Sequence, residues 1–327
     1  MAQHFLTSPA ARTLSVTQVA RLSEEEAIQI FRQIRWPDTH GQPVCPHCTC
    51  ATCYEFKSRP IFRCKACRKQ FSVTSGTLFA YHKLPIRDYL VAVALYVNGV
   101  KGKAALELSR QLGIAYKTAF VLAHKLREAP QAERRGRTLG GDGKTVEIDS
   151  GYSGGHNRPA NHKKDRIDRR LAENQTGKRQ CFIVIRERDG RSITKPFPSE
   201  EASLDFIRSR IEPGTVVHAD EAPAWNALHA RFDMKRINHS EVYSWDGACT
   251  NQAESMIARI RRAEWGIHHH ISGQYLGRYI DEMAWREDHR RESNGAQFRR
   301  ILSLAAALSP SVDFCGYWQR HRPAAAA

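Results

Sequence analysis

The sequence predicts a multidomain α/β protein: a mixed sheet with flanking helices, preceded by a small metal-binding module and a pair of helices. Short apolar runs alternate with amphipathic segments from residue 145 onward, which is typical of a sheet covered by helices. Two Cys-x₂-Cys pairs occur between residues 45 and 67, and a Gly-centred helix pair is indicated around residue 113. A chain of 327 residues is long enough for two or three such domains.

Lys and Arg outnumber Asp and Glu, giving a net charge of +16. So large an excess favours a polyanionic partner, DNA or RNA first, over a basic protein of no particular partner. The opening residues, MAQHFLTSPAARTLS, contain no apolar run like that of a secretory signal, and no run approaches a membrane span. We therefore expect a cytoplasmic protein with no membrane partner, whose nine cysteines are metal ligands or thiols rather than disulfides.

Residues 1–80 are predicted to form an N-terminal helix and a zinc ribbon. Ser23 and Glu26 match a capping box at the start of the helix, and Arg35-Trp36-Pro37 ends it. Paired knuckles each place two thiolates on one tight turn, so a tetrahedral structural Zn²⁺ is expected on Cys45, Cys48, Cys64 and Cys67. Cys50 or Cys53 could replace one of these ligands, although Cys50 follows Cys48 too closely for both to bind the same zinc ion without strain. A redox dithiol is the alternative, but it does not explain why the knuckles are paired.

Residues 81–128 are predicted to form a helix-turn-helix DNA-binding region. The segments 104–111 and 116–127 read as helices, with Leu112-Gly113-Ile114 as the turn. The second helix would read DNA through side chains near its N-terminus, and basic side chains further along would contact phosphates. The expected contacts are Tyr116, Lys117 and Thr118 for bases, and Lys125 and Arg127 for phosphates. Helix packing without DNA binding is the alternative, because many helix pairs have a Gly turn.

Residues 129–144 are polar and Gly-rich and read as a linker, and residues 145–290 as the catalytic domain. The expected order within this domain is three strands, then alternating helices and strands, then a helix, which is the order of a ribonuclease-H-like mixed sheet. Its predicted elements are strands 145–149, 180–187, 191–197, 215–219 and 234–238, and helices 200–211, 222–231 and 251–264. Residues 291–327 are expected to form a C-terminal helix and a frayed tail.

Three acidic residues fall where a metal-dependent phosphoryl-transfer site needs them. Asp149 and Asp220 end apolar runs that read as strands, and Glu254 lies in an amphipathic helix. Oxygen ligands of this kind suit a pair of Mg²⁺ or Mn²⁺ ions, which can clamp the attacking and leaving oxygens of an in-line displacement. Arg261, two helical turns after Glu254, would hold a phosphate beside them. Any one of these carboxylates could instead be a solvated surface group.

Several residues around the triad are secondary candidates. The basic loop 156–180 leaves the strand end that carries Asp149, so Lys163, Lys164 and Arg166 could contact the DNA backbone, although a solvated charge run is the usual alternative. One histidine of the run 268–270, with His269 as the candidate, could contact a phosphate; three consecutive histidines cannot share a metal. Asp281 and Glu282 could add a carboxylate, but the pattern favours the surface for both.

Taken together, these motifs resemble the zinc-ribbon group of bacterial insertion-sequence DDE transposases, the ISXO2-like transposases. The segments that carry the resemblance are Arg35-Trp36-Pro37 with CPHC, CKACRKQFSVTSGTLF, EIDSGYSGG, HAD, NHSEVYSWDGACTNQAES and YLGRYIDEMAWR. The resemblance implies a ribonuclease-H-like core, Mg²⁺ dependence and binding to terminal inverted repeats, with Asp149, Asp220 and Glu254 as metal ligands and Arg261 as the basic partner. Ser150 stands where the family often has an acid. The third ligand is Glu or Asn in this group, so Asn251 is a second candidate beside Glu254.

The predicted function is that of a DNA transposase, which hydrolyses phosphodiesters at the element ends and joins the 3′-hydroxyl to target DNA. We expect a homo-multimer on double-stranded DNA, because two ends must be paired, and association with the nucleoid when bound. Two alternatives remain at this stage. The chain could be a zinc-ribbon and helix-turn-helix regulator with an inactive core, or a nuclease or resolvase of the same fold, which cuts without joining.

Overall fold

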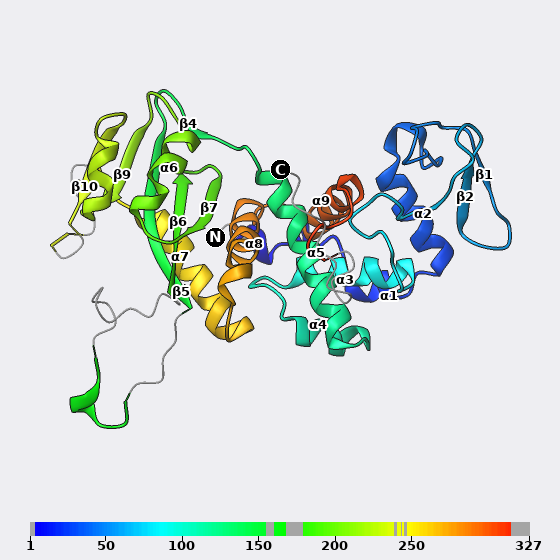
Figure 1. The fold of residues 1–327 in the computed structure, drawn as a ribbon, viewed down its shortest axis with the longest axis horizontal. Helices are drawn as coiled ribbons and strands as arrows, with labels where there is room; N and C mark the ends of the chain where they lie inside the picture. The colour runs from blue at the N-terminus through cyan, green and yellow to red at the C-terminus, as the bar shows by residue number, and fades with distance from the viewer. Residues whose placement is uncertain are drawn as a thin grey trace. The chain divides into compact units, whose positions relative to one another are not determined.

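The computed structural model describes residues 4–154, 160–167, 179–238, 241–242, 244 and 247–314, and these fall into two compact units. The first unit comprises residues 1–133 and 289–327, and the second comprises residues 134–288. Figure 1 shows the helices and strands of both units and labels most of them. The C-terminal helix is thus part of the same unit as the N-terminal segments.

The first unit holds a small antiparallel sheet and a group of helices. The capping box predicted at Ser23 is confirmed, because its hydroxyl accepts from the Glu26 N–H and the Glu26 carboxylate accepts from the Ser23 N–H. Asn294 at the start of the last helix accepts from the N–H groups of Thr13 and Leu14, which ties the N-terminal segment to that helix. The elements are α1 (Val16–Ala20), α2 (Glu24–Arg35), β1 (Cys53–Glu55), β2 (Ile61–Cys64), β3 (Gln70–Ser72), α3 (Ile86–Asn98), α4 (Ala105–Leu112), α5 (Tyr116–Arg134) and α9 (Asn294–Ala307).

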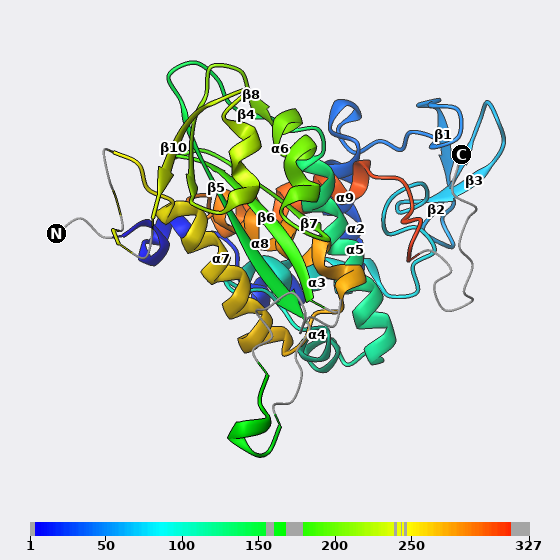
Figure 2. The ribbon, with the colours of Figure 1, turned by 60° about the vertical axis from the view of Figure 1, so that its left-hand side comes forward.

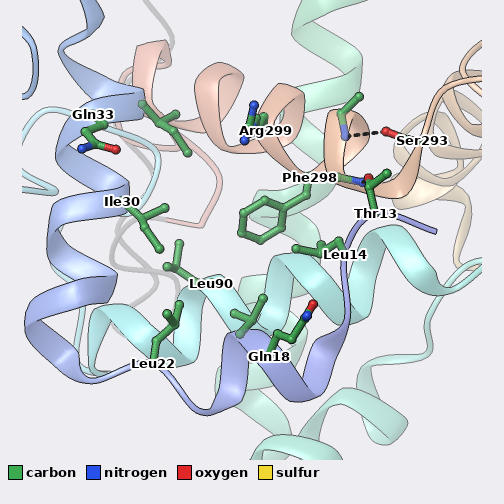
Figure 3. Close-up of a pocket in the computed structure, with 14 residues that line it drawn as sticks. Thr13, Leu14, Gln18, Leu22, Ile30, Gln33, Leu90, Ser293, Phe298 and Arg299 are labelled. Atoms are coloured by element: carbon green, nitrogen blue, oxygen red, sulfur yellow. Dashed lines mark hydrogen bonds between the residues drawn. The ribbon is translucent and has the colours of Figure 1, made fainter. Parts of the chain in front are cut away.

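A cavity of about 820 Å³ lies among α1, α2, α3 and α9 of this unit. Its walls are mainly apolar: Ile30, Leu90 and Phe298 point toward one another across it, and Arg299 lies at its edge (Figure 3). At its rim the Ser293 hydroxyl accepts from the Ala296 N–H and so caps α9.

The second unit is built on a five-stranded mixed sheet in the order β10-β9-β5-β6-β7. Strands β5, β6 and β7 are antiparallel, whereas β9 runs parallel to β5 and β10 parallel to β9. The strands lie close to the predicted positions: β5 (Thr145–Gly154), β6 (Arg179–Glu187), β7 (Ser192–Phe197), β9 (Val216–Asp220) and β10 (Asp233–Ile237), with a small parallel pair formed by β4 (Leu139–Gly140) and β8 (Ile211–Glu212).

Helices cover both faces of this sheet (Figures 1 and 2). On one face Ile183 and Ile185 pack with α6 (Leu204–Arg210) and the 3₁₀ helix Pro223–Leu228. On the other, Phe182 and Val184 pack with α7 (Asn251–Ala263) and α8 (Leu276–Asp288). Neighbouring residues of β6 therefore face opposite cores, as the period of two in a strand requires.

The predicted helix 222–231 and linker 129–144 need correction. The former is a short 3₁₀ helix, which begins at Pro223. Within residues 129–144, α5 continues to Arg134. The charged residues that suggest a linker have partners in the folded protein: Glu133 pairs with Arg300 at 2.7 Å, and Arg134 donates to the Ser192 carbonyl at 2.6 Å. Leu139 and Gly140 then form β4.

Candidate functional site

Asp149 and Asp220 lie side by side on neighbouring strands of the large sheet. Ile148 of β5 is opposite Ala219 of the parallel strand β9, so the residue that follows each falls at the same level of the sheet. Val146 and Ile148 belong to the core on the α6 side. Because strand side chains alternate, Asp149 faces the side that α7 covers.

Glu254 approaches the two aspartates from the first turn of α7, which packs against β5. The pKa of Asp149 is raised to about 7, first by burial and then by the nearby charges of Asp220 and Glu254, while the Ser150 N–H and Arg261 act in the opposite direction. The charges of the other three predicted residues, Asp220, Glu254 and Arg261, therefore all act on the Asp149 carboxylate. Arg261 itself is exposed on α7.

Local hydrogen bonds orient the carboxylates of this acidic cluster, Asp149, Asp220 and Glu254. One Asp149 oxygen accepts from the Ser150 N–H at 2.7 Å, and one Asp220 oxygen accepts from the indole N–H of Trp225 at 2.6 Å. The Thr250 hydroxyl donates to Glu254 at 2.9 Å. Each acid is thus held through one oxygen while it faces the others, which is an arrangement suited to an oxygen-seeking cation.

Glu147, which the sequence reasoning missed, joins the first strand of the site to the helix that carries Glu254. Its side chain is fully buried, and one oxygen accepts from the N–H groups of Gln252 at 2.7 Å and Ala253 at 3.0 Å. The other oxygen accepts from Nε of Arg188 at 3.0 Å. A carboxylate that satisfies the free amides of a helix N-terminus acts as its cap and is favoured by the helix dipole. The available signal was its position two residues before Asp149, and therefore on the same face of β5.

The cysteines predicted as zinc ligands lie together in the first unit. Cys45 Sγ is 3.6 Å from Cys67 Sγ, and Cys48 Sγ is 3.5 Å from Cys64 Sγ. Four sulfurs around a zinc ion with Zn–S bonds of about 2.3 Å would be about 3.8 Å apart, so the set fits a tetrahedral site. Within the part of the chain that the structure describes, this is the one group of His, Cys, Asp or Glu side chains whose ligand atoms all lie within 4.8 Å. Cys50 and Cys53 lie outside it, and the three carboxylates of the acidic cluster are more widely spaced.

Comparison with known families matches both regions. Residues 138–288, nearly the whole second unit, match the ISXO2-like transposase domain, and residues 22–70, which contain the four cysteines, match the transposase zinc-ribbon domain. The chain therefore carries an ISXO2-like transposase domain together with a transposase zinc ribbon.

A relative in Halobacterium salinarum supports this assignment. It is described as an uncharacterized protein in transposable element ISH50, and it is 26% identical to this chain over 116 residues. The aligned region covers 35% of this chain and only 38% of the relative. No solved structure matches the chain.

Helices α4 and α5 of the first unit form the predicted helix pair. Gly113 between them has a φ of 65°, a left-handed conformation that glycine adopts without strain. Tyr116, Lys117 and Thr118 are exposed on the first turn of α5, where a reading helix would present them. Lys125 is half-buried.

The prediction that Arg127 contacts phosphate is wrong. Its side chain is 1% exposed, and its guanidinium donates to the Lys103 carbonyl at 3.1 Å. Arg127 lies on the inner face of α5 and holds the loop that precedes α4. Basic composition alone could not separate this inward arginine from the exposed lysine of the first turn.

The secondary candidates differ in their exposure. Lys163 and Lys164, in a 3₁₀ helix, and Arg166 are exposed; residues 156–159 and 168–178 of the predicted basic loop lie outside the described residues. Asn251 is exposed as the first residue of α7, whereas Glu254 is partly buried beside Asp149. His269 is exposed and follows a π-helical turn, Glu264–His268, with a φ of 58°.

The expected surface placement of Asp281 and Glu282 is wrong. Asp281 accepts from the Thr194 hydroxyl at 3.1 Å, and fully buried Glu282 pairs with Arg286 at 2.7 Å. Both carboxylates therefore have partners within the second unit, in which α8 packs against β7. No helix of the described residues is long and apolar enough to cross a membrane.

Proposed function

We propose that this protein is a DNA transposase that cuts phosphodiesters at the ends of an insertion sequence and joins the freed 3′-hydroxyl to target DNA. The observation that carries the proposal is the convergence of Asp149, Asp220 and Glu254, from two adjacent strands and a facing helix, so that two of them raise the pKa of the third. Like-charged carboxylates forced together in a partly buried site favour a cation between them.

The donor set fits Mg²⁺ or Mn²⁺, because all three side chains offer hard carboxylate oxygens. When bound, such a metal pair supplies Lewis acidity and a nucleophile at neutral pH. The protein positions the reactants: Ser150 and Trp225 hold the two aspartates through one oxygen each, and Glu147 holds the helix of Glu254 against β5. Exposed Arg261, whose charge acts on Asp149, would neutralise phosphate charge near the acids, and exposed His269 would contact a phosphate.

The reaction has two phosphoryl transfers at the same site. Water attacks a phosphodiester at the element end, and the leaving 3′-oxygen takes up a proton to become a hydroxyl. This hydroxyl then attacks a target phosphodiester in line and expels the target 3′-oxygen, so one bond forms for each that breaks. Positioning and charge neutralisation supply the catalysis, and no covalent protein–DNA intermediate is required.

The remaining parts of the chain would bind the substrates. The sheet order of the second unit, three antiparallel strands followed by two parallel ones, supports a ribonuclease-H-like catalytic core. In the first unit, exposed Tyr116, Lys117 and Thr118 on α5, with Lys125 behind them, would recognise the terminal inverted repeats together with the zinc ribbon. Exposed Lys163, Lys164 and Arg166 would contact the phosphates of the DNA backbone. A homo-multimer would hold the two ends of the insertion sequence together.

A strand-transfer assay tests the proposal with purified protein, Mg²⁺ and a labelled duplex that carries the element's terminal repeat. Wild type should give joined products, which Asp220→Asn should lose while it still binds DNA. Asp205→Asn is the matched control, because this aspartate is 97% exposed on α6. Binding without cleavage in wild type would favour a DNA-binding regulator, and cleavage without joining would favour a nuclease or resolvase.

A further inference from the structure

A second cavity of the first unit opens beside the N-terminal half of α5. Its volume is about 330 Å³, at the lower end of the range for small-molecule sites. Three lysines line it: Lys83 from the segment before α3, and Lys117 and Lys125 from α5. None of its lining residues in the described part of the chain is acidic, so the cavity attracts an anionic group.

The walls of this lysine cavity are apolar and aromatic. Leu84, Val121, Leu122 and buried Phe314 form them, and Tyr81 and Tyr89 lie among them. Tyr81 is 80% exposed and has a φ of 59°. The left-handed region is unfavourable for so bulky a residue, and strain of this kind occurs most often at functional sites. A large aromatic ring is therefore held at the surface next to three cations.

Residues 79–89, which include one wall of the lysine cavity, are fixed by contacts with one another. The Tyr89 ring packs 5.0 Å from Phe79 and 6.0 Å from His82, between ring centroids. The Tyr89 hydroxyl accepts a hydrogen bond from the Lys83 N–H. His82 Nδ1 is 2.9 Å from the Leu84 carbonyl oxygen. The site is thus formed before any ligand arrives, which lowers the entropic cost of binding.

We propose that the lysine cavity binds one unstacked nucleotide of the DNA that α5 contacts. Its base would enter between the apolar wall and Tyr81, and the adjoining phosphates would lie on Lys83, Lys117 and Lys125. This inference rests on the proposed function, because it requires α5 to bind DNA. It adds that recognition includes a displaced base in addition to the outer surface of the duplex.

The combination of side chains selects this ligand. Phosphates of an intact duplex would use the lysines but leave the apolar wall and the exposed ring without a role. A base stacks on an aromatic ring whatever its sequence, and its backbone follows positive charge. The larger cavity of Figure 3 lacks this combination, because its walls are mainly apolar and Arg299 is the one charged residue among its described lining residues.

The test compares the full-length, zinc-loaded protein on two fluorescein-labelled duplexes of the same sequence, one of which carries a single unpaired 2-aminopurine. Fluorescence anisotropy gives the two affinities, and 2-aminopurine emission reports the environment of the extra base. Wild type should bind the bulged duplex about tenfold more tightly, as expected for one base stacked on an aromatic side chain. Its 2-aminopurine emission should be quenched.

Two variants alter the lysine cavity in different ways. Val121→Trp fills it and should abolish the preference for the bulge without loss of affinity for the intact duplex. Tyr81→Asn removes the exposed ring, and asparagine tolerates the left-handed backbone, so this variant should fold and lose both preference and quenching. Lys101→Ala is the control, because Lys101 is an exposed lysine of the same unit outside the cavity, and it should keep the preference.

Equal binding of the two duplexes by wild type, or a preference that persists in both cavity variants, would overturn the lysine cavity as a nucleotide site. In that case normal binding of the intact duplex would leave the proposed transposase function standing. Failure of wild type to bind either duplex would instead reject DNA binding by this unit, and the nucleotide site with it.

Discussion

Replacing Asp149 by asparagine should stabilise the metal-free protein at neutral and alkaline pH. The pKa of Asp149 is raised from 3.8 to about 7, so the folded state binds its proton more strongly than the unfolded chain does. For an acid with a raised pKa, stability is highest below pH 4 and falls as the pH rises toward 7. The shift corresponds to about 4 kcal/mol at 1.36 kcal/mol per pH unit. Asparagine remains neutral and can keep the hydrogen bond from the Ser150 N–H.

Urea unfolding of both proteins in buffer free of EDTA and of divalent metal, with the zinc retained, would measure this effect. The difference in free energy of unfolding between Asp149→Asn and wild type should be near zero at pH 4 and approach 4 kcal/mol at pH 8. Mg²⁺ should then stabilise wild type and leave the variant unchanged, because the cation relieves a repulsion that the neutral amide no longer produces. Asp205→Asn, at an exposed position, should show neither effect. A difference that does not depend on pH would refute the reasoning.

Three further substitutions test other parts of the structure. Cys48→Ser should lose the bound zinc, whereas Cys50→Ser should keep one ion per chain; equal zinc content by mass spectrometry would contradict the ligand set. Arg127→Met should lower the free energy of unfolding by about 2–4 kcal/mol with little change in DNA affinity for the folded fraction. Lys117→Ala should instead weaken DNA binding with little change in the free energy of unfolding. Glu147→Gln should lower the free energy of unfolding by about 2 kcal/mol and reduce strand transfer, because a neutral amide caps α7 more weakly; unchanged strand transfer would argue against its positioning role.

Local signals explain the parts of the fold that the sequence predicted well. The capping box at Ser23 depends on residues three apart, and the strands depend on runs of a few residues. The four cysteines could be predicted because two knuckles of fixed spacing close one tetrahedron. Asp149 and Asp220 could be expected together because each ends an apolar run, and the parallel register of β5 and β9 aligns those ends.

The features that the sequence could not reveal depend on partners distant in the chain. Glu147 accepts from the amides of residues 252 and 253, and Arg127 donates to the carbonyl of Lys103. Asp281 and Glu282 resemble surface acids until α8 packs against β7 and buries them. A charged residue in an amphipathic segment is usually exposed, so pattern alone assigns such residues to the wrong face.

The acidic cluster also explains why a chain with a net charge of +16 would need a cation at its proposed catalytic site. The net positive charge attracts the DNA backbone, but three carboxylates facing an approaching phosphodiester would repel it at the point of reaction. Protonation of Asp149 relieves part of this repulsion at the cost of a ligand, whereas divalent cations relieve it and keep all three ligands. Metal and DNA should therefore bind with positive coupling: each makes the site more favourable for the other, by the same factor in both directions.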